Sequence, residues 1–276
     1  MSARPISLLG LPYDASSSFL RGPALAPPLI RKALASDSAN YWTEDGHDLA
    51  VANTFHDAGD LELPEDAAQA LPIIENAVDK LCQHGRPVIC LGGDHSVTYP
   101  ILRAFHKHRA NLTILHLDAH PDLYHDLNGP LSHACPFARI MENQLARRLV
   151  QVGIRTISQH QLDQARRFRA EVITMQHRGK ISALKLDGPL YLSLDIDVLD
   201  PAFAPGISHY EPGGMSVRDV LDIIQAIRVP IVGADIVEYN PTRDRHDQTA
   251  MVCAKLLKEI AAAMLRGGGA PRPDWV

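Results

Sequence analysis

The sequence has few cysteines, no excess of positive charge and no long apolar run, and each absence excludes a class of protein. The four cysteines among 276 residues form no CxxC pair, so we expect buried free thiols rather than disulfides or zinc ligands. The formal net charge of -5, spread along the chain, provides no basic surface for nucleic acid. No apolar stretch is long enough to cross a bilayer, and the N-terminus lacks a secretory signal pattern. We therefore expect a cytoplasmic protein that binds neither nucleic acid nor membranes.

Short apolar runs alternate with longer amphipathic segments, a pattern typical of a parallel sheet with helices on both sides. Strands are expected at residues 6–11, 87–91, 112–117, 148–153, 171–175, 189–194 and 230–234. Helices are expected at residues 27–35, 67–83, 99–108, 158–169, 216–227 and 248–265. The fifth helix has Ser216 as its expected N-cap, with Asp219 three residues later.

This alternation predicts an α/β fold: a single three-layer αβα domain over residues 1–276 with a central, parallel, doubly wound sheet. Residues 267–276 include a run of glycines and prolines and are expected to form a flexible tail that the chemistry does not need.

Three short clusters of aspartate and histidine dominate the chain: GGDHS at 92–96, DAHPD at 118–122 and DID at 195–197. Successive side chains of an extended strand alternate between its faces, so the members of each Asp-x-His-x-Asp or Asp-x-Asp series point the same way. Several carboxylates aimed at one cleft repel each other and resist desolvation unless cations neutralise them. Each cluster begins where an apolar strand ends, and in open parallel sheets ligands bind outside the carboxyl ends of the strands. The clusters therefore predict one metal site.

The candidate ligands are four carboxylates and two imidazoles, with no thiolate. They are His95, Asp118, His120, Asp122, Asp195 and Asp197. Oxygen-rich sites with some imidazole favour manganese, although nickel, cobalt or iron could occupy the same ligands. We expect two Mn²⁺ per chain, bridged by carboxylates and activating a shared water as the nucleophile. His116 lies next to these ligands and has two interpretations, a structural histidine or a hydrogen-bond partner of the site.

The sequence resembles the ureohydrolase family, which includes arginase, agmatinase, guanidinobutyrase and formiminoglutamase. Besides the three clusters, the resemblance rests on SHACPFARIME at 132–142, SLDIDVLDPAFAPG at 193–206, EPGGMS at 211–216 and GADIVEYNP at 233–241. Segments 16–34 and 205–221 are most similar to arginases of the plant type. The resemblance implies the arginase-like αβα fold and a trimeric or hexameric homo-oligomer.

The resemblance also implies residue roles. His95 and Asp122 would bind one metal, His120 and Asp197 the other, and Asp118 and Asp195 both. His133 falls where the family has a histidine that passes a proton to the leaving amine, and Glu238 where it has a carboxylate for the substrate guanidinium. The residues themselves agree, because Asp235 and Glu238 are expected to follow the last strand into the same crevice, where either could stabilise the tetrahedral state.

The expected reaction is hydrolysis of L-arginine to urea and L-ornithine by this metal-dependent amidinohydrolase. The loop after Asp122 contains Asn128 and Ser132, neutral donors suited to an α-carboxylate, and no Lys or Arg that a dicarboxylate such as formiminoglutamate would need. Agmatine is the main alternative, because Asp126 in the same loop could bind its distal ammonium group, and 4-guanidinobutyrate is the third. A metal-binding scaffold without turnover is a different alternative, disfavoured because every expected ligand is present.

Overall fold

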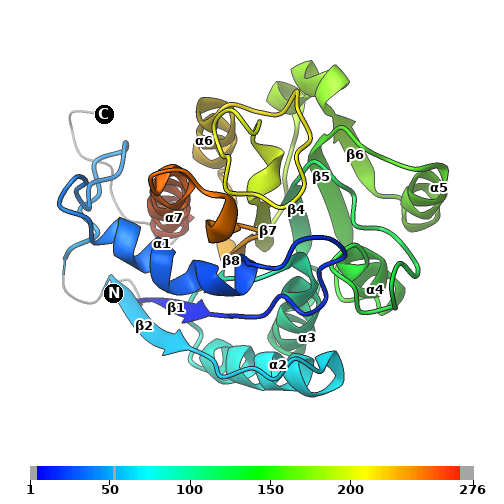
Figure 1. Cartoon of the computed structure of the whole chain (residues 1–276), viewed down its shortest axis with the longest axis horizontal. Coiled ribbons are helices and arrows are strands. Elements are labelled where there is room, and N and C mark those ends of the chain that lie inside the picture. The colour runs from blue at the N-terminus through cyan, green and yellow to red at the C-terminus, as the bar shows by residue number, and fades with distance from the viewer. Residues whose placement is uncertain (1–4, 52–53, 268–276) are drawn as a thin grey trace.

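The computed structural model describes residues 5–51 and 54–267. Its centre is one eight-stranded sheet in the order β2-β1-β3-β8-β7-β4-β5-β6, with every neighbouring pair parallel (Figure 1). The strands are β1 (Ile6–Gly10), β2 (Phe55–Asp60), β3 (Val88–Leu91), β4 (Thr113–Leu117), β5 (Arg148–Ile154), β6 (Glu171–Thr174), β7 (Leu190–Asp195) and β8 (Ile231–Val237). The predicted parallel α/β sheet is confirmed.

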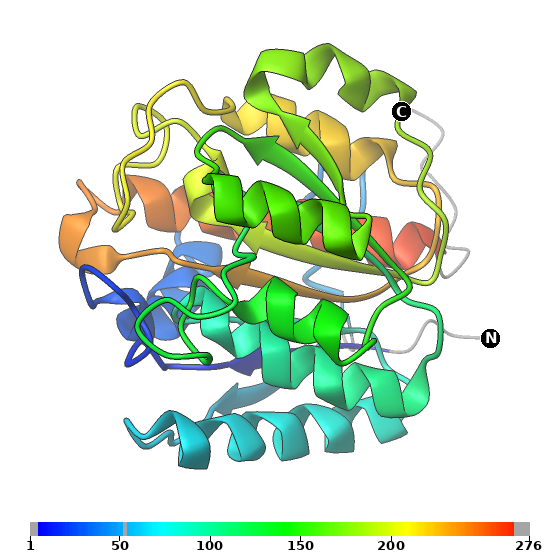
Figure 2. The ribbon, with the colours of Figure 1, turned by 90° about the vertical axis from the view of Figure 1, so that its right-hand side faces the viewer.

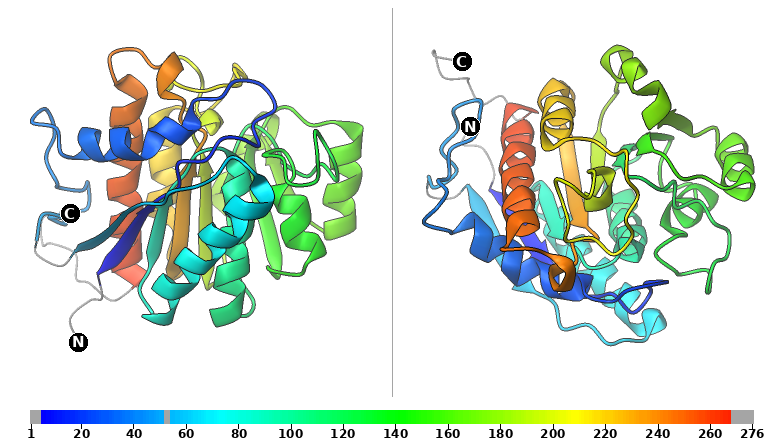
Figure 3. Two further views of the ribbon diagram at one scale, coloured as in Figure 1. Left: turned by 60° about the horizontal axis from the view of Figure 1, so that its bottom comes forward. Right: turned by 45° about the horizontal axis from the view of Figure 1, so that its top comes forward.

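Helices cover both faces of the sheet. They are α1 (Ala26–Leu34), α2 (Ala67–Gln83), α3 (Thr98–His108), α4 (Pro136–Glu142), α5 (Gln159–Phe168), α6 (Val217–Ala226) and α7 (Gln248–Gly267). Buried side chains of α1, α6 and α7 share one hydrophobic cluster, and those of α2 to α5 share the other. Figure 2 shows α4 and α5 on the near side of the sheet with α7 behind it, and Figure 3 shows α2 and α3 opposite α7. The three-layer αβα architecture is therefore confirmed.

The central strands β3, β8, β7 and β4 are almost entirely buried because helices cover both of their faces. In β3, Ile89 and Leu91 face the cluster shared with α7, whereas Val88 and Cys90 face the other. Two elements, β2 and α4, were not predicted from the sequence. Strand β2 is exposed along nearly its whole length at the sheet edge, so it lacks the apolar run by which the other strands were predicted.

The metal-ligand clusters converge because the strands they follow are neighbours. β3, β8, β7 and β4 lie side by side in the middle of the sheet, so their carboxyl ends meet at one place. One prediction fails here. β8 was expected to end at residue 234, but it continues to Val237, so Asp235 lies inside the sheet, paired with Cys90 and Ser193.

Local predictions had mixed outcomes. Ser216 is the N-cap of α6 and forms a capping box with Asp219, as predicted. All four cysteines are free and buried, as predicted. The predicted tail at 267–276 lies outside the described residues except for Gly267, which ends α7. Within 5–51 and 54–267, no helix is long and apolar enough to cross a membrane.

Candidate active site

A cavity of about 390 Å³ contains most of the predicted site residues. Its lining residues are Ser18, His120, Asp122, Tyr124, Leu127, His133, Ala134, Thr156, Ile157, Ser158, Gln161, Asp195, Asp197, His209 and Glu238. We call the four carboxylates among them, Asp122, Asp195, Asp197 and Glu238, the acidic wall. We call Tyr124, Thr156, Ser158 and Gln161, which carry hydroxyl or amide groups, the neutral wall.

His95 begins a short 3-10 helix (His95–Val97) after β3 and does not line the cavity. It contacts three members of the acidic cluster, by which we mean Asp118, Asp122, Asp195 and Asp197. Its Nδ1 lies 3.2 Å from Asp118 Oδ2, 3.1 Å from Asp122 Oδ2 and 3.1 Å from Asp195 Oδ2. The ring is fully buried, and its Nδ1 has no hydrogen-bond partner among the residues that the structure describes.

This arrangement fits a divalent cation. Burial lowers the pKa of His95, but the three surrounding carboxylates outweigh it and raise that pKa well above its usual value. One ring nitrogen carries at most one proton, which cannot satisfy three carboxylates at the same distance. The carboxylates also destabilise one another: burial and the neighbouring Asp197 and Asp118 raise the pKa of Asp195 well above its usual value. These two imidazoles and four carboxylates offer nitrogen and oxygen ligands for divalent cations, whose charge would relieve the repulsion among the carboxylates.

A second group of ligand atoms adjoins the first. His120 Nδ1 lies 2.9 Å from Asp197 Oδ2 and 3.5 Å from Asp118 Oδ1. Asp118 thus directs one oxygen toward His95 and the other toward His120. Ligand atoms of Asp118, His120 and Asp197 all lie within 4.8 Å of one another. The structure therefore brings all six predicted ligands together, with Asp118 between the two histidines.

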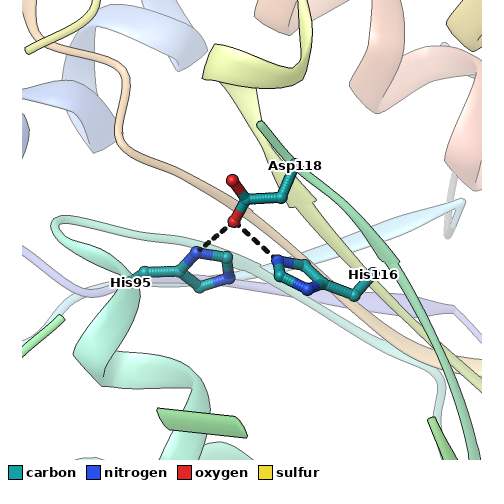
Figure 4. A group of neighbouring side chains, drawn as sticks. All are labelled: His95, His116 and Asp118. Carbon is teal, nitrogen blue, oxygen red and sulfur yellow. Dashed lines mark hydrogen bonds and ion pairs between the residues drawn. The ribbon is translucent and has the colours of Figure 1, made fainter. Parts of the chain in front are cut away.

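His116 also contacts Asp118, and Figure 4 shows both His95 and His116 pointing a nitrogen at the same Asp118 oxygen. His116 Nε2 is 2.6 Å from Asp118 Oδ2, and its Nδ1 is 2.9 Å from Gln151 Nε2. The Gln151 amide also donates to the Pro121 carbonyl, so its Nε2 is the donor and His116 Nδ1 accepts. His116 Nε2 therefore carries the ring proton and donates a hydrogen bond to Asp118. Of its two interpretations, the hydrogen-bond partner is the one the structure supports.

His133 and Glu238 form an ion pair beside the acidic wall. His133 Nδ1 is 2.8 Å from Glu238 Oε1, which also accepts the backbone N–H of His95 at 2.9 Å. Burial lowers the pKa of His133, but Glu238 outweighs it and raises that pKa to about 9. Burial raises the pKa of Glu238, but His133 and the His95 N–H outweigh it, so the Glu238 pKa lies below its usual value.

The other nitrogen of His133 meets a donor and an acceptor from the same residue. The Ser18 backbone N–H donates to His133 Nε2 at 3.1 Å, and Ser18 Oγ lies 2.8 Å from that nitrogen. The N–H satisfies the neutral ring, and the hydroxyl oxygen accepts from the protonated ring. Either protonation state of His133 therefore has a partner in Ser18.

The backbone at this site adopts conformations that side chains disfavour. Asp122 and Glu238 both have left-handed φ values, 50° and 63°. Such positions cost on the order of 1–3 kcal/mol each and cluster at functional sites. Gly93 allows a close approach, because a Cβ there would lie 1.6 Å from the Tyr13 carbonyl oxygen. Its own carbonyl accepts the Glu238 N–H at 2.9 Å, which holds that residue in place.

Three predicted site residues lie elsewhere. Asp235 is fully buried within β8 and is not among the cavity-lining residues. Asn128 is exposed in its loop and does not line the cavity, whereas Tyr124 and Leu127 of the same loop do. Ser132 is buried, and its Oγ accepts the Ala134 N–H at 3.2 Å. None of the three is positioned to contact a ligand in the cavity.

Several lining residues were not predicted. Thr156 and Gln161 follow β5, whose carboxyl end carries no acidic motif, although the rule that ligands bind at strand ends could have indicated it. His209 lies between the rings of His120 and His133, with centroids 5.8 and 5.4 Å away. It falls in the segment 205–221 that carried the plant-type resemblance, which is the one signal that could have identified it.

Comparison with known proteins supports one family throughout. The model of the Arginase family matches residues 4–263. Arginase 1, mitochondrial, of Arabidopsis thaliana is 47% identical over 274 residues, covering 93% of this chain and 80% of its own. The solved arginase from Medicago truncatula has a TM-score of 0.89 and 44% identity, covering 95% of this chain and 88% of its own. The agmatinase of Bacillus subtilis is more distant, at 33% identity over 94% of this chain and 91% of its own.

These relatives correct one prediction. The arginases of Arabidopsis thaliana, Oryza sativa and Medicago truncatula are named mitochondrial, or chloroplastic and mitochondrial. The expectation of a cytoplasmic protein is therefore wrong. It came from the lack of a signal pattern in the sequence, and such an absence carries no information about the compartment in which a protein works.

The fold, the convergence of two histidines and four aspartates at the carboxyl ends of three central strands, and a family match over residues 4–263 lead to the same assignment. The chain belongs to the arginase family.

Proposed function

We propose that this protein hydrolyses the guanidinium group of L-arginine to urea and L-ornithine, using two Mn²⁺ ions. The observation that carries the proposal is the division of the cavity into an acidic wall suited to metals and a guanidinium, and a neutral wall suited to an amino acid. The similarity to plant arginases at 44 to 47% identity supports the same substrate.

In this proposal His95 and Asp122 would hold one ion, His120 and Asp197 would hold the other, and Asp118 and Asp195 would serve both. The buried His95 Nδ1, which faces three carboxylates, supports this distribution. Two divalent ions would neutralise the acidic cluster and make an activated water available near neutral pH. The native ion is proposed as manganese because oxygen ligands outnumber nitrogen ligands two to one.

Glu238 would hold the guanidinium of the substrate. Its Oε1 already accepts from His133 and from the His95 N–H. No hydrogen bond to its Oε2 is found among residues 5–51 and 54–267, and the residue lines the cavity. A guanidinium N–H can therefore bind Oε2 in a charge-assisted hydrogen bond, and the lowered pKa of Glu238 keeps it anionic for this task.

His133 would deliver a proton to the leaving amine. Its pKa of about 9 lies near the value of about 10.4 for an alkyl ammonium, so the transfer is nearly balanced. Because Ser18 partners Nε2 in both protonation states, the ring can give up and regain its proton without leaving a buried nitrogen unsatisfied.

The neutral wall favours arginine over agmatine. Gln161 uses its Oε1 to accept the Ser158 N–H, while no hydrogen bond from its amide Nε2 is found within the described part of the chain. That amide is a donor for an α-carboxylate. The distal ammonium of agmatine would need a carboxylate, but Asp126 is exposed, is not among the lining residues, and accepts the Gly129 N–H. None of the lining residues in the described chain is Lys or Arg, which disfavours a dicarboxylate such as formiminoglutamate.

We also propose that the protein is a homo-oligomer, a trimer or hexamer. Light scattering after size exclusion measures its mass directly, and a monomeric mass near 30.3 kDa at micromolar concentration would contradict the proposal.

The proposed activity is tested by elemental analysis and urea release on the same sample. Protein dialysed against chelator and reloaded with Mn²⁺ is expected to hold two ions per chain and to release urea from L-arginine. Two ions without urea from any guanidine would support the scaffold alternative instead. One ion or none at saturating manganese would contradict the two-metal site.

A further inference from the structure

Asp235 has a different place from the one its sequence position suggested. It is fully buried in the middle of the sheet, where three hydroxyl groups donate to it. Ser193 Oγ donates to its Oδ1 at 2.7 Å, and Thr98 Oγ1 and Tyr191 Oη donate to its Oδ2 at 2.8 and 2.7 Å. Burial and Asp235 together raise the pKa of Tyr191, which keeps that hydroxyl a donor. Both carboxyl oxygens of Asp235 therefore accept hydrogen bonds from hydroxyl groups.

Ser193 connects this carboxylate to the metal site. A serine hydroxyl has one proton, and Ser193 gives it to Asp235, so its oxygen can only accept from its other neighbour. That neighbour is His95 Nε2, at 3.0 Å. The proton of the neutral His95 ring must then be on Nε2. Its Nδ1, which faces the three carboxylates, must carry the lone pair.

We propose that Asp235, acting through Ser193, is a positioning residue that fixes the orientation and tautomer of His95 so that Nδ1 binds a metal ion. This inference rests on the two-metal site of the proposed function and assigns Asp235 a task other than contact with the substrate. Histidine ligands depend on such partners, whose loss costs about 10- to 100-fold in metal affinity.

His116 provides an internal contrast. It faces the same oxygen of Asp118 as His95 does (Figure 4), but its Nδ1 accepts from Gln151 and its Nε2–H points at the carboxylate. The two rings thus have opposite kinds of partner: Ser193 accepts a hydrogen bond from His95, whereas Gln151 donates one to His116. As a result, the Nδ1 lone pair of His95 faces the acidic cluster, but the Nε2 proton of His116 faces it. Both rings lie close enough to Asp118 to share a metal group with it, but only His95 has the protonation state of a ligand.

The test is a manganese titration of Ser193→Ala, which breaks the link, against Tyr191→Phe, which removes a different hydroxyl from Asp235 and leaves the link intact. Ser193→Ala is expected to weaken binding at one of two sites by about 10- to 100-fold. Tyr191→Phe should stay within about threefold of wild type. Turnover of Ser193→Ala should recover when manganese is raised, since no group that touches the substrate has changed. Circular dichroism of each variant verifies the fold.

Three outcomes would overturn the inference. Unchanged manganese affinity in Ser193→Ala, with active wild-type enzyme, refutes the action of Asp235 through Ser193 and leaves the proposed function intact. An equal loss of affinity in Tyr191→Phe shows that Asp235 acts only through general stability. Wild-type protein that binds no manganese refutes both this inference and the proposed function.

Discussion

The acidic wall and the neutral wall of the cavity differ in how their side chains are held. Carboxylates of the acidic wall are buried and tied to histidines, backbone amides or each other, with Asp122 and Glu238 in strained backbone conformations. The neutral wall comes from the segment after β5 and the loop at 123–132, and its groups are joined mainly by helix-capping hydrogen bonds. Catalytic chemistry needs fixed geometry, whereas recognition of a substrate tail needs only complementary groups. The comparison indicates that reaction and selectivity can be altered separately.

The largest effect is expected on the acidic wall and its bridging ligands. Asp118→Asn and Asp195→Asn should each abolish turnover, because each removes a charge that would serve both of the proposed ions. The measurement is urea release at saturating manganese, together with metal content. Asp126→Asn is the matched control: it removes an exposed carboxylate from the nearby loop and should leave activity unchanged. Full activity in either bridging variant would show that the acidic cluster is not the reaction centre.

The next effect separates proton transfer from metal binding. His133→Asn should lower kcat by about 10²- to 10⁴-fold while two ions remain bound, because His133 contacts Glu238 and Ser18 rather than the ligands. Steady-state kinetics and elemental analysis of the same preparation decide it. Loss of metal in this variant would instead place His133 among the groups that maintain the metal site.

A smaller effect should change selectivity without changing the chemistry. Gln161→Glu keeps an oxygen for the Ser158 N–H but replaces the amide donor with a carboxylate. The ratio of kcat/KM for agmatine to that for arginine should rise about tenfold, or about 1.4 kcal/mol. Gln159→Glu adds the same charge on the same helix but outside the cavity, and should not change the ratio. Equal shifts in both variants would indicate a long-range charge effect rather than contact with the substrate.

The smallest effects concern two residues that the sequence suggested for the substrate tail. Asn128→Gly retains the left-handed turn and should leave kcat and KM within about twofold of wild type, because Asn128 lies outside the cavity. Ser132→Ala removes one local hydrogen bond and should cost about 1 kcal/mol of unfolding free energy with little change in KM. Thermal denaturation and arginine saturation curves test both. A tenfold rise in KM in either variant would restore that residue to the substrate site.

The same division explains what could be predicted from the sequence. The convergence of the candidate ligands could be predicted because residues 118–122 and 195–197 stand at the carboxyl ends of strands. The expected strand alternation does not continue through them, since β4 ends at Leu117 and Ile196–Val198 form a short 3-10 helix. Asp235 was misplaced because a buried aspartate inside a strand depends on the hydroxyls of Ser193, Thr98 and Tyr191, which come from other elements. Thr156 and Gln161 belong to no acidic or histidine motif, and their place after β5 was the only signal in the sequence that pointed to them.

The two walls are proposed to divide the work: the acidic wall binds the guanidinium and the neutral wall selects the amino acid. The most direct test of this claim is the specificity constant for urea release from L-arginine, agmatine and 4-guanidinobutyrate on manganese-loaded wild-type protein. Arginine is predicted to exceed agmatine by at least about tenfold, or about 1.4 kcal/mol. A tenfold preference for agmatine would contradict the claim, because it would require a carboxylate that the neutral wall does not contain.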